Sequence, residues 1–284
     1  MTSTLPSREP TVSLGLPRAH AGTAGLAEID VDRSTRLTSI RTGELGSVHS
    51  WELVTAVDGP GTRMTVFLAG CPLRCLYCHN PDTMEMRRGT DVTADEILGR
   101  LSRYRTVLTA TGGGLTVSGG EPLMQPAFTA RLLRGAKALD LHTALDSSGF
   151  LGRHCTDEML DDLDLVLLDV KSGLPDTYRR ATGRELEPTL EFGRRLNDRG
   201  IAIWVRFVMV PGLTDAPSNV AAAADEIVAF GGAERVEVLP FHQMGRDKWA
   251  ELGLEYQLED TVPPTAEALE EVRATFRSRG LTVY

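Results

Sequence analysis

Three of the four cysteines of this chain lie within one short stretch, at Cys71, Cys75 and Cys78. Thiolates bind zinc, Cu(I) and iron–sulfur clusters, and a loop this short can turn several sulfurs toward one centre. A closed zinc site needs four ligands and normally takes a second pair from elsewhere in the chain. The remaining cysteine, Cys155, stands far downstream beside His154. Three thiolates on a four-iron cluster would leave one iron open to a substrate or cofactor.

Two other roles for the clustered cysteines have to be weighed. Disulfides are disfavoured, because three clustered cysteines cannot pair among themselves and nothing in the sequence marks a secreted protein. A zinc site completed by His79 or Cys155 is the alternative, in a protein that binds partners and catalyses nothing. If the centre is a cluster, we expect His154 and Cys155 to be structural.

The bulk composition limits the class of protein. The chain has 284 residues and is 42% hydrophobic, which suits one large α/β domain. Its formal net charge of -9 argues against a nucleic-acid partner, since such proteins need a basic surface. The sequence has no apolar run of about 18 residues and no apolar core behind N-terminal basic residues, so we expect no membrane span and no signal peptide. Unpaired cysteines indicate the reducing cytoplasm, and we expect a monomer.

The chain divides into an extension and a folded part. Residues 1–45 contain no aromatic residue and no cysteine, and are rich in Pro, Ser, Thr, Ala and Gly. Such a segment buries too little apolar surface to offset its ordering entropy, so we expect residues 1–45 to be a disordered extension. Residues 46–284 form the predicted domain.

Six buried or alternating strands are predicted in the folded part, at 63–68, 115–118, 141–145, 163–168, 201–210 and 235–239. Helical patterns lie between and after them, at 93–103, 125–139, 174–182, 188–199, 217–230 and 265–279. Alternating strands and helices predict a parallel α/β sheet, and six units are too few to close an eight-stranded barrel. The fold class expected is therefore a partial (β/α)6 TIM-like barrel, whose gap would admit a loop of a large polypeptide.

Polar residues follow two of these strands at the ends where a parallel barrel builds its site. Gly119 and Gly120 allow a close backbone approach, and Glu121 can accept hydrogen bonds from an ammonium group. A turn that merely ends the strand is the other interpretation. Asp146 ends the next strand, where it either caps a helix or lines the mouth.

The later strands carry further candidates. Asp169 and Lys171 place alternate side chains on one face, and they form either a ligand site or a simple salt bridge. Arg206 lies within an apolar strand and needs an anion, which is either a ligand or a core carboxylate. His242 is either a hydrogen-bonded rim residue or a ligand contact.

The run 75–80, Cys-Leu-Tyr-Cys-His-Asn, has the spacing and the aromatic residue of the cluster loop of radical S-adenosylmethionine (SAM) enzymes, and it resembles the glycyl-radical activating enzymes among them. Other runs resemble pyruvate formate-lyase activating enzymes in the expected order from about residue 47 onward: Asp-Gly-Pro-Gly at 58–61, Gly-Gly-Gly at 112–114, Val-Pro-Gly at 210–212 and Lys-Trp at 248–249. Activases with a cysteine-rich insertion are disfavoured, because no cysteine lies between Cys78 and Cys155.

This resemblance implies a reaction as well as the radical SAM barrel. A 4Fe-4S cluster on Cys71, Cys75 and Cys78 would bind SAM, and one-electron reduction would cleave SAM to methionine and a 5′-deoxyadenosyl radical. That radical would take a hydrogen atom from a backbone glycine of pyruvate formate-lyase, with flavodoxin or ferredoxin as the electron donor. Activation of another glycyl-radical enzyme, or a radical SAM reaction on a small molecule, is the alternative.

The resemblance also assigns residues. Asp146 would bind a monovalent cation beside SAM, although this chain has Ser147 where the family has threonine. The other residues implied to contact the cluster or SAM are Tyr77, Cys78, His79, Gly119, Gly120, Glu121, Asp169, Val170, Lys171, Arg206 and His242. Asp58 would lie near the incoming glycine. We also expect the donor to dock on basic residues near the cysteine loop, namely Arg74, Arg87 and Arg88.

Overall fold

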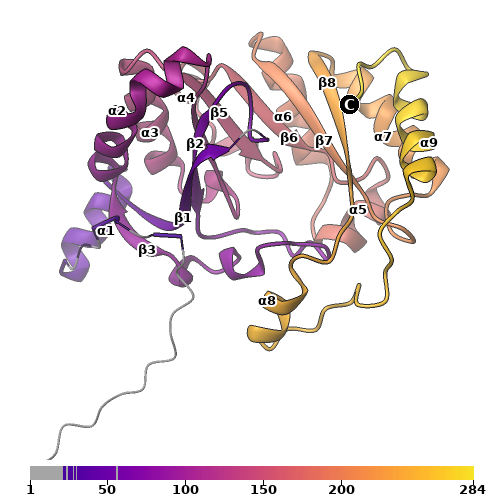
Figure 1. Ribbon diagram of the computed structural model, residues 1–284, viewed down its shortest axis with the longest axis horizontal. Coiled ribbons are helices and arrows are strands. Elements are labelled where there is room, and N and C mark those ends of the chain that lie inside the picture. The colour runs from indigo at the N-terminus through magenta and orange to yellow at the C-terminus, as the bar shows by residue number, and fades with distance from the viewer. Residues whose placement is uncertain (1–21, 24, 28, 30, 56) are drawn as a thin grey trace, which may run out of the picture.

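The computed structural model describes residues 22–23, 25–27, 29, 31–55 and 57–284. In this part of the chain one sheet of 8 strands curves around the centre of the molecule in the order β3-β1-β2-β4-β5-β6-β7-β8. Helices cover its outer face (Figure 1). Strands β3 and β8 are the two ends of the sheet, so the barrel is open. The predicted fold class, a partial barrel with a parallel sheet, is confirmed.

The parallel part of the sheet contains the strands that the sequence predicted. They are β2 (Arg63–Leu68), β4 (Gly114–Gly119), β5 (His142–Ser147), β6 (Leu165–Asp169), β7 (Ala202–Met209) and β8 (Ala233–Pro240). Each pairs in parallel with its neighbour in this order. The carboxyl ends of these strands therefore meet at one mouth, where the loops that follow them can share a site.

The helices of the barrel also begin where the sequence predicted them, although the first runs on to Ala110, beyond its predicted end at residue 103. They are α2 (Ala94–Ala110), α3 (Pro126–Ala138), α5 (Pro175–Thr182), α6 (Glu187–Asp198), α7 (Pro217–Phe230) and α9 (Ala266–Arg277). Within the predicted domain, two short α-helices were not predicted, α4 (Asp157–Asp161) and α8 (Arg246–Glu251). None of the helices in the described residues is long and apolar enough to cross a membrane.

Two antiparallel strands extend the sheet beyond β2 and were missed by the sequence analysis. They are β1 (Leu45–Thr55) and β3 (Thr90–Thr93), and β1 pairs with both β2 and β3. The pairing of β1 with β2 shifts register between Val48 and Ser50 and again between Leu53 and Thr55. Such bulges break the alternation by which a half-buried strand is recognised in a sequence.

The predicted boundary of the N-terminal extension, residue 45, needs correction. Much of residues 1–45, including 1–21, lies outside the described residues, but residues 33–41 form helix α1 (Arg33–Arg41). Asp32 caps this helix by accepting from the Ser34 backbone N–H at 2.8 Å. Arg36 forms an ion pair with Asp91 of β3. A cap and a distant ion pair thus help to hold a helix that has no buried residue and whose Leu37 and Ile40 are exposed.

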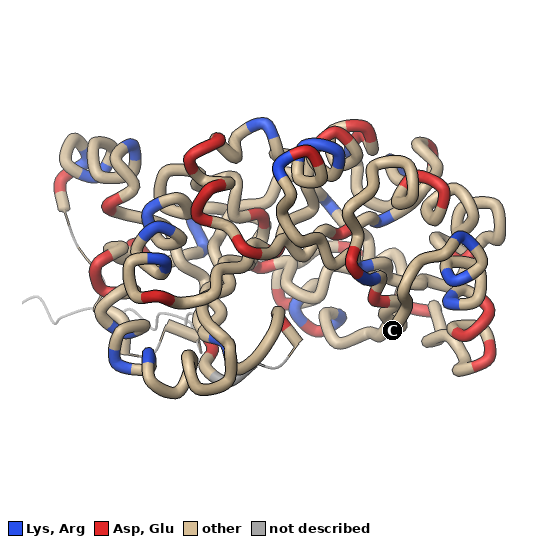
Figure 2. Tube along the Cα trace, turned by 90° about the horizontal axis from the view of Figure 1, so that it is seen from above, with Lys and Arg blue, Asp and Glu red and all other residues tan. Residues whose placement is uncertain are grey.

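The alternation of side chains along β7 shows how the sheet separates its core from its site. Ile203, Val205 and Phe207 are fully buried and belong to the core beneath the outer helices, where Phe207 meets Phe276 of α9 with ring centroids 5.4 Å apart. Residues that alternate with them point to the opposite face of the sheet. Arg206 is therefore carried on the inner face of the barrel. In the view of Figure 2, acidic and basic residues are interspersed along the described part of the chain.

Candidate cluster and cofactor site

The cysteine loop leaves β2 through a sharp turn at Gly70. Gly70 has a φ of 96°, in the region that favours glycine, and its N–H donates to the Thr83 carbonyl at 2.7 Å. The next N–H, that of Cys71, donates to the Met84 carbonyl at 3.1 Å. The start of the loop is therefore fixed by backbone bonds to the segment that follows it.

Two helices hold the rest of the loop. On one side, the Leu76 N–H donates to the carbonyl of Ala181 in α5 at 3.0 Å. On the other side, Trp249 of α8 donates its indole N–H to the Cys78 carbonyl at 2.9 Å. Gly245, just before α8, lies so close that a Cβ there would come within 2.6 Å of the same carbonyl oxygen. The loop is thus held between α5 and α8.

A cavity of about 380 Å³ lies beneath this loop, at the carboxyl ends of the strands. All three clustered cysteines line it, and none of them forms a disulfide. The other residues that line it and were predicted for the site are Tyr77, His79, Gly119, Gly120, Asp146, Asp169, Lys171 and His242. The strand ends therefore bring most of the predicted residues to one place.

The chemistry of the thiols fits a metal cluster. Burial raises the pKa of Cys78 to about 12, and it also raises the pKa values of Cys71 and Cys75. An isolated thiolate is therefore disfavoured here, and bound iron would supply the positive charge that stabilises it. The described residues contain no group of three His, Cys, Asp or Glu side chains that could hold one metal ion. A four-iron cluster takes each thiolate on a different iron.

A half-buried ion pair lies beside the cysteines. The Lys171 ammonium group is 2.8 Å from the Asp169 carboxylate and lies over the ring of Tyr77, 5.7 Å from its centroid. Burial works against the charged form of Lys171, but the charges of Asp169 and its neighbours outweigh it and raise the pKa of the lysine. Lys171 therefore stays protonated and faces the cavity with a partner already in place.

Glu121 does not line the cavity. Its side chain is fully buried, and its carboxylate accepts hydrogen bonds from the Ser147 hydroxyl at 2.8 Å and the Ser148 N–H at 3.0 Å. Burial raises its pKa, although these hydrogen bonds favour the charged form. In this structure Glu121 supports the two serines, which themselves line the cavity. The carboxylate expected at the amino group of SAM thus lies behind the cavity wall.

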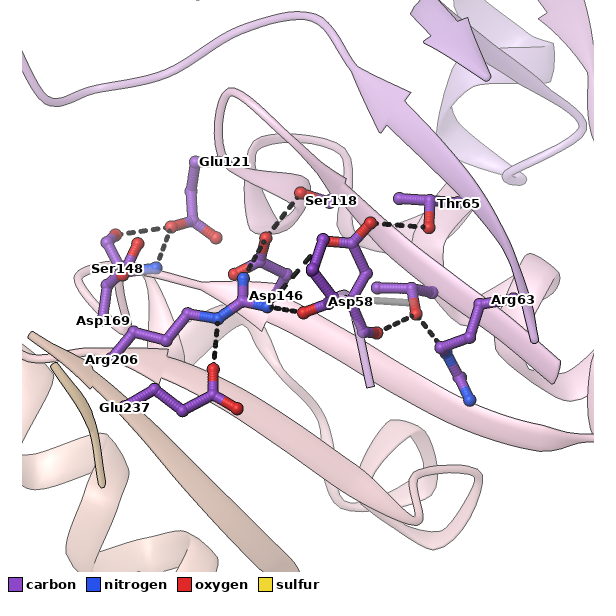
Figure 3. A network of polar contacts seen from close by, with 12 residues as sticks. Asp58, Arg63, Thr65, Ser118, Glu121, Asp146, Ser148, Asp169, Arg206 and Glu237 are labelled. Carbon is purple, nitrogen blue, oxygen red and sulfur yellow. Dashed lines mark hydrogen bonds and ion pairs between the residues drawn. The ribbon is translucent and has the colours of Figure 1, made fainter. Parts of the chain in front are cut away.

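Arg206 also lies outside the cavity lining, in a network of charges (Figure 3). Its guanidinium is 3.3 Å from the Asp146 carboxylate, 3.3 Å from Glu237 of β8 and 3.8 Å from Asp58. Asp146 also accepts from the Ser118 hydroxyl at 2.7 Å. Burial opposes the charge of Arg206, but these carboxylates outweigh it and raise the pKa of the guanidinium. The anions that Arg206 meets here belong to the chain itself.

Two residues of the cavity wall carry polar atoms without partners. The rings of His79 and His242 stack with centroids 4.0 Å apart. Among the described residues, the Nδ1 atom of His242 and the hydroxyl of Tyr77 are buried and lack a hydrogen-bond partner. Buried polar atoms are normally hydrogen-bonded, so these two are free to contact a polar ligand. Burial, with His242 as a further cause, lowers the pKa of His79, so its ring is neutral near pH 7.

The sequence analysis missed several residues of the cavity wall. Val170 was predicted here but is fully buried in the core. Residues that line the cavity without having been predicted include Asn80, Ser118, Ser148, Val208 and Leu239. Ser118, Val208 and Leu239 lie at or near the carboxyl ends of β4, β7 and β8, so their position in the predicted strands was the signal that could have found them.

Comparison with known proteins agrees with this geometry. Residues 65–223 match the model of the radical SAM superfamily. The chain is 37% identical over 238 residues to pyruvate formate-lyase 1-activating enzyme of Escherichia coli K12, which covers 83% of this chain and 97% of that protein. It is 42% identical over 216 residues to pyruvate formate-lyase-activating enzyme of Clostridium pasteurianum, covering 76% of this chain and 90% of that protein. The chain belongs to the pyruvate formate-lyase activating enzyme family.

Membership of this family settles the general nature of the site. Radical SAM enzymes use a 4Fe-4S cluster and SAM, and the three free cysteines on one cavity wall fit these cofactors. The fold agrees too: Streptococcus suis SuiB bound to SAM superposes with a TM-score of 0.56 at 14% identity, over 75% of this chain and 47% of that one. The chain is therefore an enzyme, and the zinc-binding interaction protein is set aside.

Proposed function

We propose that this chain activates pyruvate formate-lyase by placing a radical on one of its backbone glycines. The observation that carries the proposal is the set of three free cysteines on a cavity at the mouth of an open barrel, in a chain 37% identical to a named activating enzyme. No side-chain acid or base takes a hydrogen atom from a glycine Cα, so the chemistry comes from a cofactor. When bound, the cluster and SAM supply it through one-electron cleavage of SAM to a 5′-deoxyadenosyl radical.

The residues of the chain divide the work of holding these groups. Cys71, Cys75 and Cys78 bind three irons of the cluster. The Lys171 ammonium group, kept charged beside Asp169, offers a positive charge to the carboxylate of SAM. His242 offers the unpartnered Nδ1 atom to the adenosyl part.

Glycines and serines complete the proposed SAM site. Gly119 and Gly120 let the backbone of the strand end approach the ligand. The hydroxyls of Ser147 and Ser148, held by Glu121, give that wall a fixed polar face. Asp146 is already close to Arg206, and we propose that any monovalent cation there shares the carboxylate with it.

The setting of the reaction follows from the same features. The loop of pyruvate formate-lyase that carries the glycine enters through the open side of the barrel, and the turn that contains Asp58 lies on its path. We place the reaction in the reducing cytoplasm, where the cysteines stay free, with the chain acting as a monomer and a flavodoxin or ferredoxin supplying electrons.

The test is an anaerobic assay with reconstituted protein. With reductant, SAM and pyruvate formate-lyase, the wild-type chain should produce a glycyl radical that electron paramagnetic resonance detects. Replacing Cys71, Cys75 or Cys78 by alanine should abolish both SAM cleavage and the radical, because each loses a cluster ligand. Cys155→Ala is the matched control, since Cys155 is buried against Met159 with its sulfur 3.4 Å from that of the methionine, and it should retain activity. SAM cleavage without a radical on this partner would contradict the assigned substrate.

A further inference from the structure

Three exposed arginines lie on the cysteine loop or on the end of α5 that is hydrogen-bonded to it. Arg74 lies in the loop and donates to the carbonyls of Cys71 at 2.8 Å and Leu73 at 2.7 Å. Arg184, just after α5, donates to the Pro72 carbonyl at 2.7 Å. Arg180 of α5 donates to the Gly212 carbonyl at 2.6 Å. Arg74, Arg180 and Arg184 are called the loop arginines below.

The loop arginines share an electrostatic property. No ion pair joins any of them to an acidic side chain within the described residues, and their hydrogen bonds go to neutral backbone carbonyls. Nearby Arg179 is different, because Glu185 accepts from it at 2.9 and 2.7 Å. The loop arginines therefore keep their charge available to a partner, in a chain whose net charge is -9.

The loop arginines differ in their charge environment from two of the basic residues that the sequence analysis predicted as the docking site of the electron donor. Arg87 and Arg88 both lie within ion-pair distance of Glu85, at 2.7 and 3.4 Å. Their positive charge is partly cancelled where they stand. Of the predicted docking residues, only Arg74 carries an uncompensated charge, and the structure adds Arg180 and Arg184 beside it.

We propose that the loop arginines form the docking surface for an acidic one-electron carrier protein that reduces the cluster. The inference rests on the proposed function, which requires a reductant. Charge complementarity selects the partner. The chain as a whole is acidic, so an acidic carrier is attracted to it only where positive charge is concentrated, and the loop arginines provide such a place. In the transfer, the reduced carrier loses one electron and the cluster gains one, with no bond formed or broken.

The position of the patch suits electron transfer. Arg74 and Arg184 are hydrogen-bonded to the carbonyls of residues 71–73, so a carrier seated on them touches the backbone that bears Cys71. The substrate cavity lies on the inner side of this loop. A carrier on the outer face therefore leaves the cavity to SAM and the partner glycine.

The experiment compares charge reversals at Arg180 and Arg184. Arg74 is left intact because it lies next to Cys75. At low ionic strength, Arg180→Glu and Arg184→Glu should each slow cluster reduction by reduced flavodoxin about tenfold, since steering acts on the association rate. Each should also raise the dissociation constant of the complex, measured by titration calorimetry. The slower reduction and the weaker binding should both become less marked at high salt, which screens the charges.

Two controls separate docking from damage. Photoreduction through 5-deazariboflavin, which is small and neutral, should proceed at the wild-type rate in both variants. Arg131→Glu makes the same charge change on α3, where Arg131 pairs with Asp95, and should leave the flavodoxin rate within about twofold of wild type. Arg87→Glu, at the paired site, should have a smaller effect than either loop variant.

Each outcome decides between specific readings. Equal slowing with both reductants would mean that the arginines support the cluster loop and do not dock a carrier. Unchanged flavodoxin rates and affinity in both loop variants, or a larger effect of Arg87→Glu, would overturn the docking surface while leaving the proposed function intact. A wild-type chain that takes up no iron would overturn the proposed function and this inference with it.

Discussion

The cavity wall and the Arg206 network lie side by side on the inner face of one sheet, yet they differ in whether their polar atoms have partners within the chain. In the network, Arg206 is surrounded by Asp146, Glu237 and Asp58, so the chain itself satisfies the charges (Figure 3). On the cavity wall, the Nδ1 atom of His242 and the hydroxyl of Tyr77 lack partners among the described residues.

This difference separates support from binding. A buried charge that loses its partners destabilises the folded protein, so substitutions in the network should lower the free energy of unfolding. An unpartnered polar atom beside a cavity contributes little to stability, and its value appears when a ligand satisfies it. Substitutions in the two regions should therefore change different measurements.

The largest effect is expected from Arg206→Met. The change removes the cation that three largely buried carboxylates share, and the free energy of unfolding should fall by about 3 to 5 kcal/mol. Urea denaturation of the chain measures it. Arg206→Lys keeps the charge and is the matched control, with a smaller loss because an ammonium group cannot reach several carboxylates as a guanidinium does. A stable Arg206→Met protein would show that the network is not a structural support.

The opposite signature is expected from His242→Ala. Stability should change by less than about 1 kcal/mol, because the lost ring lines the cavity, makes no hydrogen bond through Nδ1 in the described structure and gives up only its stacking on His79. Affinity for SAM, measured by titration of the anaerobically reconstituted protein, should fall about tenfold, the equivalent of one hydrogen bond to a buried group. The control is His154→Ala, away from the cavity lining, which should leave SAM affinity unchanged. Loss of stability without loss of SAM affinity would show that His242 supports the fold, as the residues of the Arg206 network do, and does not bind SAM.

The same division explains what could be predicted from the sequence. The parallel strands and their helices follow from local apolar patterns, and residues at strand ends meet because parallel strands share a mouth. The partners of polar groups depend on distant chain. Arg206 was recognised as a charge that needs an anion, and Glu121 as an acceptor for an ammonium group. Their partners in the structure include Glu237 on β8 for Arg206 and Ser148, in the loop after β5, for Glu121, and no local pattern reveals either of them. Strand β1 was not predicted, because its bulges interrupt the alternation of apolar and polar residues by which a strand is recognised.

A smaller effect should appear at the amino ends of the strands, far from the cysteine loop. Burial, with the nearby charge of Arg63 as a second cause, lowers the pKa of His142. The folded protein then binds a proton at His142 less readily than the unfolded chain does. This contribution to stability is present above the ordinary histidine pKa of about 6.5 and is lost as pH falls from there toward the folded value.

His142→Gln should therefore flatten the dependence of unfolding free energy on pH between about 7 and 5, without altering SAM affinity at pH 7.5. Urea denaturation at several pH values measures the slope for both proteins. An unchanged slope in His142→Gln would contradict a lowered pKa of His142 in the folded protein.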